Sequence, residues 1–255
     1  HTHTTFIPLL FVIVHAIESS ISTAALALLV WQTMPTELSS KAYPVPSIST
    51  VLRLRAYALI MRMSRELGVS ITITLPLAIS AKATHYAPFF LLMTIVSGIY
   101  TIARYGIGLA TTASLCHAEK NPSSVRGIIQ QVQRVTIIFF GPCIASALLA
   151  TLTPWCAPTL ALAGVFSIMA AGIEIILAAY EQAGNLFGNG ARSALLRTID
   201  LCVTFLLIIS VKNWFYAYPP MVHGIEYLCI ATTIFITRAI LLFAIIWCSN
   251  LKDNA

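Results

Sequence analysis

Four ionisable residues stand in the middle of long apolar stretches of the sequence, where charged side chains are rare. They are Glu18, Arg104, Glu174 and Arg238. At the centre of a lipid bilayer such a side chain costs about 2.5–3.5 kcal/mol on insertion scales, so it usually pairs or faces a water-filled cavity. If the apolar stretches cross a membrane, we expect these groups either to form ion pairs or to bind an ion or a substrate.

Glu174 is the strongest candidate for binding a substrate or a coupling ion, either H+ or Na+. Glu181 follows seven residues later, so the two carboxylates lie on nearly the same face of a helix. Burial disfavours the charged form of an isolated carboxylate, so a Glu that faces a cavity can exchange protons near neutral pH. The alternative is a structural pair between Glu174 and Arg104 or Arg238, and the sequence favours neither reading.

Arg104 and Arg238 can instead bind an anion directly. A guanidinium group keeps its charge and makes forked contacts with carboxylate or phosphate. Two central arginines suit a lipid-linked or phosphorylated substrate better than a cation. Asp200, three residues after Arg197, is expected to form a structural pair between helices, and so is Glu18.

The sequence lacks the motifs of the common catalytic and metal sites. It contains no GxSxG, no HExxH and no phosphate-binding loop before a Lys, and its six cysteines form no CxxC pair. The net charge is +6, but the Lys and Arg residues do not gather among aromatic side chains as in nucleic-acid-binding proteins. We therefore expect no enzyme activity, no metal, no cofactor and no nucleic-acid partner.

The composition identifies the elements that must hold these residues. Of the 255 residues, 58% are hydrophobic and 9% are charged, and the mean hydropathy is +0.86. An average soluble domain has about 25% charged residues, so the surplus of apolar surface predicts an integral membrane protein.

The apolar stretches are long enough to be membrane-spanning helices, which need about 20 residues each. No stretch alternates apolar and polar residues as the strands of a membrane barrel do. The sequence therefore predicts an all-α polytopic bundle of about seven spanning helices, at 6–31, 67–84, 88–117, 127–152, 157–184, 194–214 and 222–249.

The only long connection, residues 32–66, has a basic second half. Arg53, Arg55, Arg62 and Arg65 stand there among Leu, Ile and Met, which predicts an amphipathic helix on an anionic membrane surface. The alternative is a cytoplasmic extension of the next helix.

Three residues are candidate hinges for conformational change. Pro76 removes a backbone hydrogen bond within the span 67–84, which predicts a kink. Gly184 and Gly188 flank the predicted turn between the spans 157–184 and 194–214.

The loop charges predict the orientation. Ten Lys and Arg residues fall on one side of the predicted membrane, two on the other and three inside helices, which accounts for all 15. The positive-inside rule then places the N-terminus outside and the C-terminus in the cytoplasm. An odd number of spans that begins outside, at His1 rather than Met, suggests the tail end of a longer protein.

Two segments resemble the multidrug and toxic compound extrusion (MATE) transporters. One is GIGLATTASLCHAEKNPSSVRG at 106–127, where a helix rich in small residues ends in a short charged loop. The other is AGNLFGNGARS at 183–193, which is similar to the family's A-G-x-L-x-G turn. Two departures are Leu115-Cys116-His117 in place of the common Gly-Gln, and Phe187 in place of a common Arg.

The resemblance implies an architecture of two six-helix lobes joined by a long cytoplasmic connection. Residues 1–31 would be the last helix of the first lobe, 32–66 the connection, and 67–255 the second lobe. It also implies a secondary active transporter that exports small organic molecules by alternating access. The span 67–84 lacks the carboxylate that members often carry there, which leaves the coupling ion open.

Two other functions remain open. One is a flippase for a lipid-linked saccharide or another amphipathic anion, and the other is a non-transporting structural membrane subunit. The expected partners are a small-molecule or lipid-linked substrate and membrane lipids, and the expected location is the bacterial inner membrane.

Overall fold

The computed structural model of the chain describes residues 56–61, 63–65, 67–68, 87–117, 122–152, 157–217 and 224–250. The chain divides into two compact units, His1–Ser47 and Ile48–Ala255. All of the described residues belong to the second unit, and only these are discussed below.

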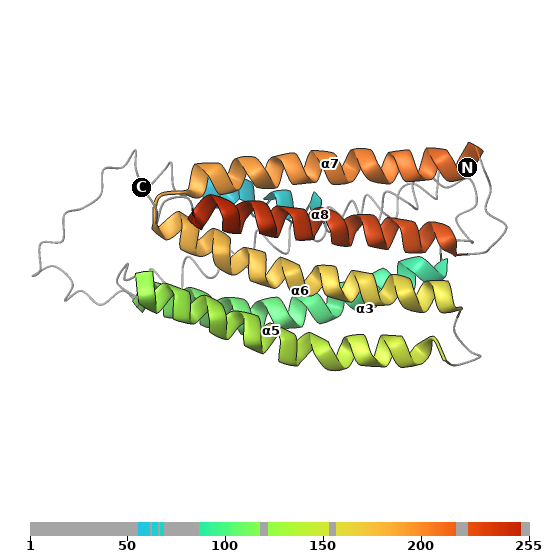
Figure 1. The fold of residues 1–255 in the computed structure, drawn as a ribbon, viewed down its shortest axis with the longest axis horizontal. Coiled ribbons are helices and arrows are strands. Elements are labelled where there is room, and N and C mark those ends of the chain that lie inside the picture. Colours follow the sequence, from blue (N-terminus) through green and yellow to red (C-terminus); the bar gives the residue numbers. More distant parts are fainter. Residues whose placement is uncertain are drawn as a thin grey trace, which may run out of the picture. The chain divides into compact units, whose positions relative to one another are not determined.

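The described part of the chain is helical and contains no strand. Five segments are long and apolar enough to cross a membrane, and Figure 1 shows them as a bundle. In chain order the elements are α3 (Ala87–Ala103), the π-helix η3 (Arg104–Gly108), α4 (Leu109–His117), α5 (Pro122–Ala150), α6 (Pro158–Leu186), α7 (Gly190–Ala217) and α8 (Ile225–Asn250).

These helices confirm the predicted fold class and the last five predicted spans. α3, η3 and α4 together form one span, and the observed ends differ from the predicted ends by five residues or fewer. The largest difference is at α5, which begins at Pro122 instead of residue 127, because proline is well tolerated in the first turn of a helix. The predicted span 6–31, with Glu18, lies outside the described residues, and so does the span 67–84 beyond residue 68, with Pro76.

α6 is the central helix of the described bundle. It contacts α3, α5, α7 and α8, and 61% of its most apolar stretch is buried, against 17–39% for the other four spans. The residues that it buries include Ala163, Ala170, Ala171 and Ala179. Small side chains let neighbouring helices approach closely inside a membrane, so α6 can contact four helices at once.

The outer surface of the bundle is apolar. Ile138 is 73% exposed, and Leu109 and Phe243 are each 67% exposed. A soluble protein rarely exposes contiguous apolar area on this scale, whereas lipid-facing helices require it. The chain is therefore an integral membrane protein built as an all-α polytopic bundle.

A tight turn of defined geometry joins α6 to α7. The amide of Asn189 donates to the carbonyl of Gly184 at 2.7 Å, and the amide of Gly188 donates to that of Asn185 at 3.2 Å. Gly188 has φ +83°, a left-handed conformation that glycine adopts readily. This is a Schellman motif, which satisfies the last carbonyls of α6 and ends that helix sharply.

In the helical residues described between 56 and 68, one arginine of the predicted basic segment turns into the bundle. The apolar side chains Leu59, Met63 and Leu67 of this stretch are about half exposed, while Arg65 turns inward and its side chain is only 11% exposed. This stretch buries Arg65 because two carboxylates of the bundle receive it. Arg53, Arg55 and Arg62 lie outside the described residues, so the amphipathic helix on the membrane surface stays a prediction.

Candidate functional site

The site is built on the two carboxylates of α6. Glu174 and Glu181 are two helical turns apart, and both reach Arg197 of α7. The terminal nitrogens of Arg197 contact the two carboxylate oxygens of Glu174 at 2.7 and 2.9 Å, and its Nε donates to Oε1 of Glu181 at 2.7 Å. One fully buried guanidinium group thus uses its planar fork to join both acidic residues.

A second arginine bridges the same two carboxylates. Nε of Arg65 lies 3.1 Å from Oε1 of Glu174, and its Nη2 donates to Oε2 of Glu181 at 2.7 Å. Glu181 therefore contacts two guanidinium groups, and its side chain is 2% exposed.

The third arginine comes from α8. Nε of Arg238 lies 3.4 Å from Oε2 of Glu174, and its Nη1 pairs with Oδ2 of Asp200 on α7. Glu174 therefore contacts three guanidinium groups, which come from α7, α8 and the stretch at 56–68.

Together these side chains form a charge-balanced cluster, which we call the ion-pair network. Its three cations and three anions cancel, and each side chain is 11% exposed or less. Burying a single unpaired charge costs several kcal/mol, so charges in this position must be compensated. The members of the ion-pair network are Arg65, Glu174, Glu181, Arg197, Asp200 and Arg238.

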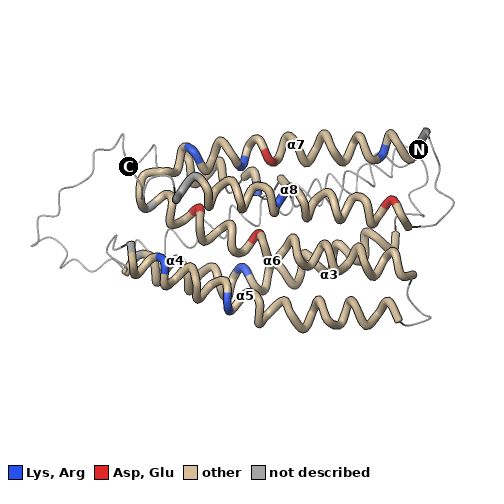
Figure 2. The backbone as a smooth tube through the Cα atoms, viewed as in Figure 1, with Lys and Arg blue, Asp and Glu red and all other residues tan. Residues whose placement is uncertain are grey.

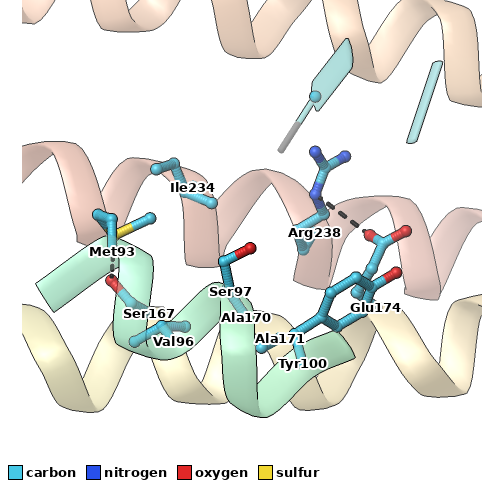
Figure 3. A pocket seen from close by; sticks show the side chains of 11 residues that line it. Met93, Val96, Ser97, Tyr100, Ser167, Ala170, Ala171, Glu174, Ile234 and Arg238 are labelled. Carbon is cyan, nitrogen blue, oxygen red and sulfur yellow. Dashed lines mark hydrogen bonds and ion pairs between the residues drawn. The ribbon is translucent and has the colours of Figure 1, made fainter. Parts of the chain in front are cut away.

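A cavity of about 60 Å³ lies beside two members of the network. Figure 3 shows Glu174 and Arg238 at one end of it, with the hydroxyl groups of Ser97 and Tyr100 nearby and Ser167 at the other end. By volume it holds roughly four water molecules, whereas sites for drug-sized ligands measure about 300–1,000 Å³. The cavity therefore suits water or a small ion and is too small for an organic substrate.

Gly68 completes the cavity wall next to Arg238. A Cβ atom at this position would lie 2.9 Å from Nη2 of Arg238. Any larger residue would thus displace the guanidinium group, so the glycine allows Arg238 to reach its partners.

Only some of the site residues predicted from the sequence belong to the ion-pair network. The structure brings Glu174, Glu181 and Arg238 together, and it places Arg104 at the start of η3, on a helix outside the ion-pair network. Gly184 lies in the last turns of α6 and Gly188 in the turn that follows. Both glycines belong to the turn that ends α6, and their role as hinges stays a prediction.

The sequence does not single out Arg197 or Arg65 as members of the network. Arg197 follows the polar turn GNGARS, and Arg65 lies in the basic half of the connection 32–66, which is expected on the membrane surface or as a cytoplasmic extension of the next helix. Asp200 was expected to form a structural pair, and it does so with Arg238. The available signal is the spacing of Arg197 and Asp200 by three residues, after which α7 has no charged residue until Lys212.

Compared with protein-family models, curated protein sequences and solved structures, the chain has no match. What the structure establishes is an integral membrane bundle with a buried, charge-balanced ion-pair network in its interior.

Proposed function

We infer that the chain forms the C-terminal portion of a secondary active transporter similar to the MATE family. In this proposal residues 67–255 are the second lobe, and the lobe moves against a first lobe in alternating access. The substrate is a small organic molecule, and the driving ion is H+ or Na+. The protein lies in the bacterial inner membrane with the C-terminus of the chain in the cytoplasm.

The observation that carries the proposal is the contact of Glu174 with three arginines beside a water-sized cavity. A static pair needs one partner, whereas this carboxylate holds α7, α8 and the stretch at 56–68 to α6. Since the guanidinium groups oppose the approach of a cation, a proton or Na+ must compete with them for Glu174. Ion binding would therefore loosen these helices, which is the coupling that a transporter requires.

The positions of the two segments that resemble the family support the proposal. Residues 106–117 run from η3 through α4 to its end, and α5 begins at Pro122. Residues 183–193 form the tight turn between α6 and α7. Both connections join antiparallel helices at the end of the bundle that carries Arg126 and Arg192, which agrees with a cytoplasmic side.

The proposal is tested by transport in proteoliposomes. The full-length protein is reconstituted with ethidium as an organic cation and with 1-naphthyl phosphate as an organic anion, and uptake is followed under an imposed pH or Na+ gradient. We expect gradient-driven uptake of one of the two probes. Glu174→Gln should reduce this uptake at least about 10-fold, because the variant lacks the carboxylate charge that a proton or Na+ neutralises.

Glu226→Gln is the matched control. Glu226 is also paired, with Lys212 at 2.8 Å, but it lies in the first turn of α8 and away from the cavity. If neither gradient drives uptake of either probe, or if Glu174→Gln behaves as the control does, the ion-pair network is structural and the chain belongs to a non-transporting membrane subunit.

A further inference from the structure

A polar patch lies on the exposed face of α5. Gln130, Gln131 and Arg134 are all exposed there, within a helix that is long and apolar enough to cross the membrane. α5 is also the least buried of the described spans, with 17% of its most apolar stretch buried. This face must therefore meet something other than the core of the described bundle.

Contacts with α6 place the patch deep in the membrane. The side chains of Thr136 and Phe140 lie within 3.7 Å of the Cβ position of Gly172, and Gly172 is the middle residue of α6 (Pro158–Leu186). Arg134 is only two residues from Thr136, so it lies within about 6 Å of the midpoint of α6 along the helix axis. An arginine facing hydrocarbon at this depth costs about 2.5–3.5 kcal/mol.

No residue in the described part of the chain compensates this charge. The cations of the ion-pair network each contact carboxylates at close range, whereas Arg134 forms no ion pair or hydrogen bond with any described residue. Gln133, its neighbour, turns the other way and donates to the hydroxyl of Tyr180 at 3.3 Å.

The spans 87–117 and 122–150 carry no acidic residue, and the carboxylates of α6, which also contacts α5, are paired within the ion-pair network. The same two spans contain Arg104, Arg126 and Arg134. Figure 2 shows the acidic residues on α6, α7 and α8, whereas α5 carries basic residues alone. η3, which begins at Arg104, contacts α5, and π-helical turns of this kind often occur at functional sites.

The patch continues into an apolar surface on the same helix. Ile137 and Ile138 are 67% and 73% exposed, and they follow Arg134 by three and four residues, which places them on its face. A guanidinium group and two amides can donate hydrogen bonds to an oxyanion, while the isoleucines contact hydrocarbon.

We propose that Arg134, Gln130 and Gln131 bind the phosphate or carboxylate group of an amphipathic anionic substrate, whose apolar part lies along Ile137 and Ile138. This inference rests on the proposed transport function and specifies the class of substrate. Arg134 is charged at membrane depth because the substrate supplies the missing negative charge.

The experiment measures binding rather than transport. The full-length protein is placed in phosphatidylcholine nanodiscs and titrated with 1-naphthyl phosphate or with its cationic match, trimethyl-1-naphthylammonium. A second set of nanodiscs contains phosphatidic acid, which competes with the soluble phosphate if the natural source of the oxyanion is a lipid headgroup.

We expect saturable binding of the naphthyl phosphate and none of the ammonium compound. Arg134→Gln should weaken binding at least about 10-fold, because a charge-assisted contact is lost, and Arg134→Lys should lie between this variant and the wild type. Arg192→Gln is the control, since Arg192 is an exposed arginine at the start of α7.

The outcomes separate this inference from the proposed function. Absence of saturable anion binding, equal binding of the ammonium compound, or equal effects of Arg134→Gln and Arg192→Gln would each overturn the inference. Gradient-driven uptake of ethidium that is unaffected by Arg134→Gln would overturn it while the transport proposal stands. Anion binding that depends on Arg134 without gradient-driven transport would overturn the transport proposal alone.

Discussion

Arg197 holds the two carboxylates of α6 together, and this makes it the most sensitive residue of the ion-pair network. It is fully buried and contacts both Glu174 and Glu181. Replacing it by Met would leave three buried negative charges against two positive ones. Breaking a buried ion pair by removing one partner costs about 3–5 kcal/mol.

We therefore expect Arg197→Met to lower the unfolding free energy of the protein in detergent micelles by about 3–5 kcal/mol. Arg197→Lys should cost less, because it keeps the charge but loses the planar fork. Titration with a denaturing detergent measures both. Arg192→Met, on the exposed first turn of the same helix, should change stability by less than about 0.5 kcal/mol, and an equal loss in both variants would contradict the buried role of Arg197.

The sequence predicted part of this site and not the rest, for a physical reason. Glu174 and Arg238 stand out because a charge in the middle of an apolar stretch is costly unless it has a partner or faces water. The spacing of Glu174 and Glu181 also predicted their shared face, and both reach Arg197. Arg197 and Arg65 stand at the ends of apolar stretches, where sequence does not distinguish a charge in the headgroup region from one that turns into the bundle.

The turn between α6 and α7 has a strict sequence requirement at one of its glycines. A Cβ atom at Gly190 would collide with Oδ1 of Asn185. At Gly184 the nearest atom to an added Cβ is Oγ of Ser193 at 3.4 Å, an ordinary contact distance. The two glycines of one turn thus differ in how well they tolerate a side chain.

We expect Gly190→Ala to destabilise the protein and Gly184→Ala to have little effect. Asn185→Ala should restore much of the stability of Gly190→Ala, since the collision is with the Asn185 side chain, and Oδ1 of Asn185 forms no hydrogen bond with a described residue. A double-mutant cycle on unfolding free energies gives the interaction, expected to be about 0.5–3 kcal/mol for residues in contact. Additive effects would mean that the backbone, rather than the side chain, sets the constraint.

At the scale of the elements, the positions of the spans in the sequence were predictable. The rotation of each helix about its own axis, which decides the face that meets its neighbours, was not. Hydropathy alone placed α3 to α8 because each must offer about 20 apolar residues to lipid. A span that is apolar on every face carries little information about which face meets its neighbours. For this reason the inward turn of Arg65 and the outward turn of Arg134 came only from the structure.

At the scale of the whole molecule, the described helices show which connections lie on the same side of the membrane. They do not show which side is cytoplasmic. The α4–α5 and α6–α7 connections share one end of the bundle, and the α5–α6 and α7–α8 connections share the other, because consecutive spans are antiparallel. Arg126 and Arg192 lie at the first end, and Lys212 lies near the second. The excess of positive charge near the first end predicts that it is cytoplasmic.

Cysteine labelling tests this orientation in intact cells. Single cysteines replace Ser124 and Phe187 at the first end, or Leu152, 81% exposed, at the second end, in a background without the native cysteines. A membrane-impermeant maleimide should label Leu152→Cys directly and the other two variants only after permeabilisation. The reverse pattern would invert the topology, place the proposed cytoplasmic connections outside and contradict the positive-inside assignment. Direct labelling of all three would contradict the span assigned to α5, since its two ends could then not lie on opposite sides of a membrane.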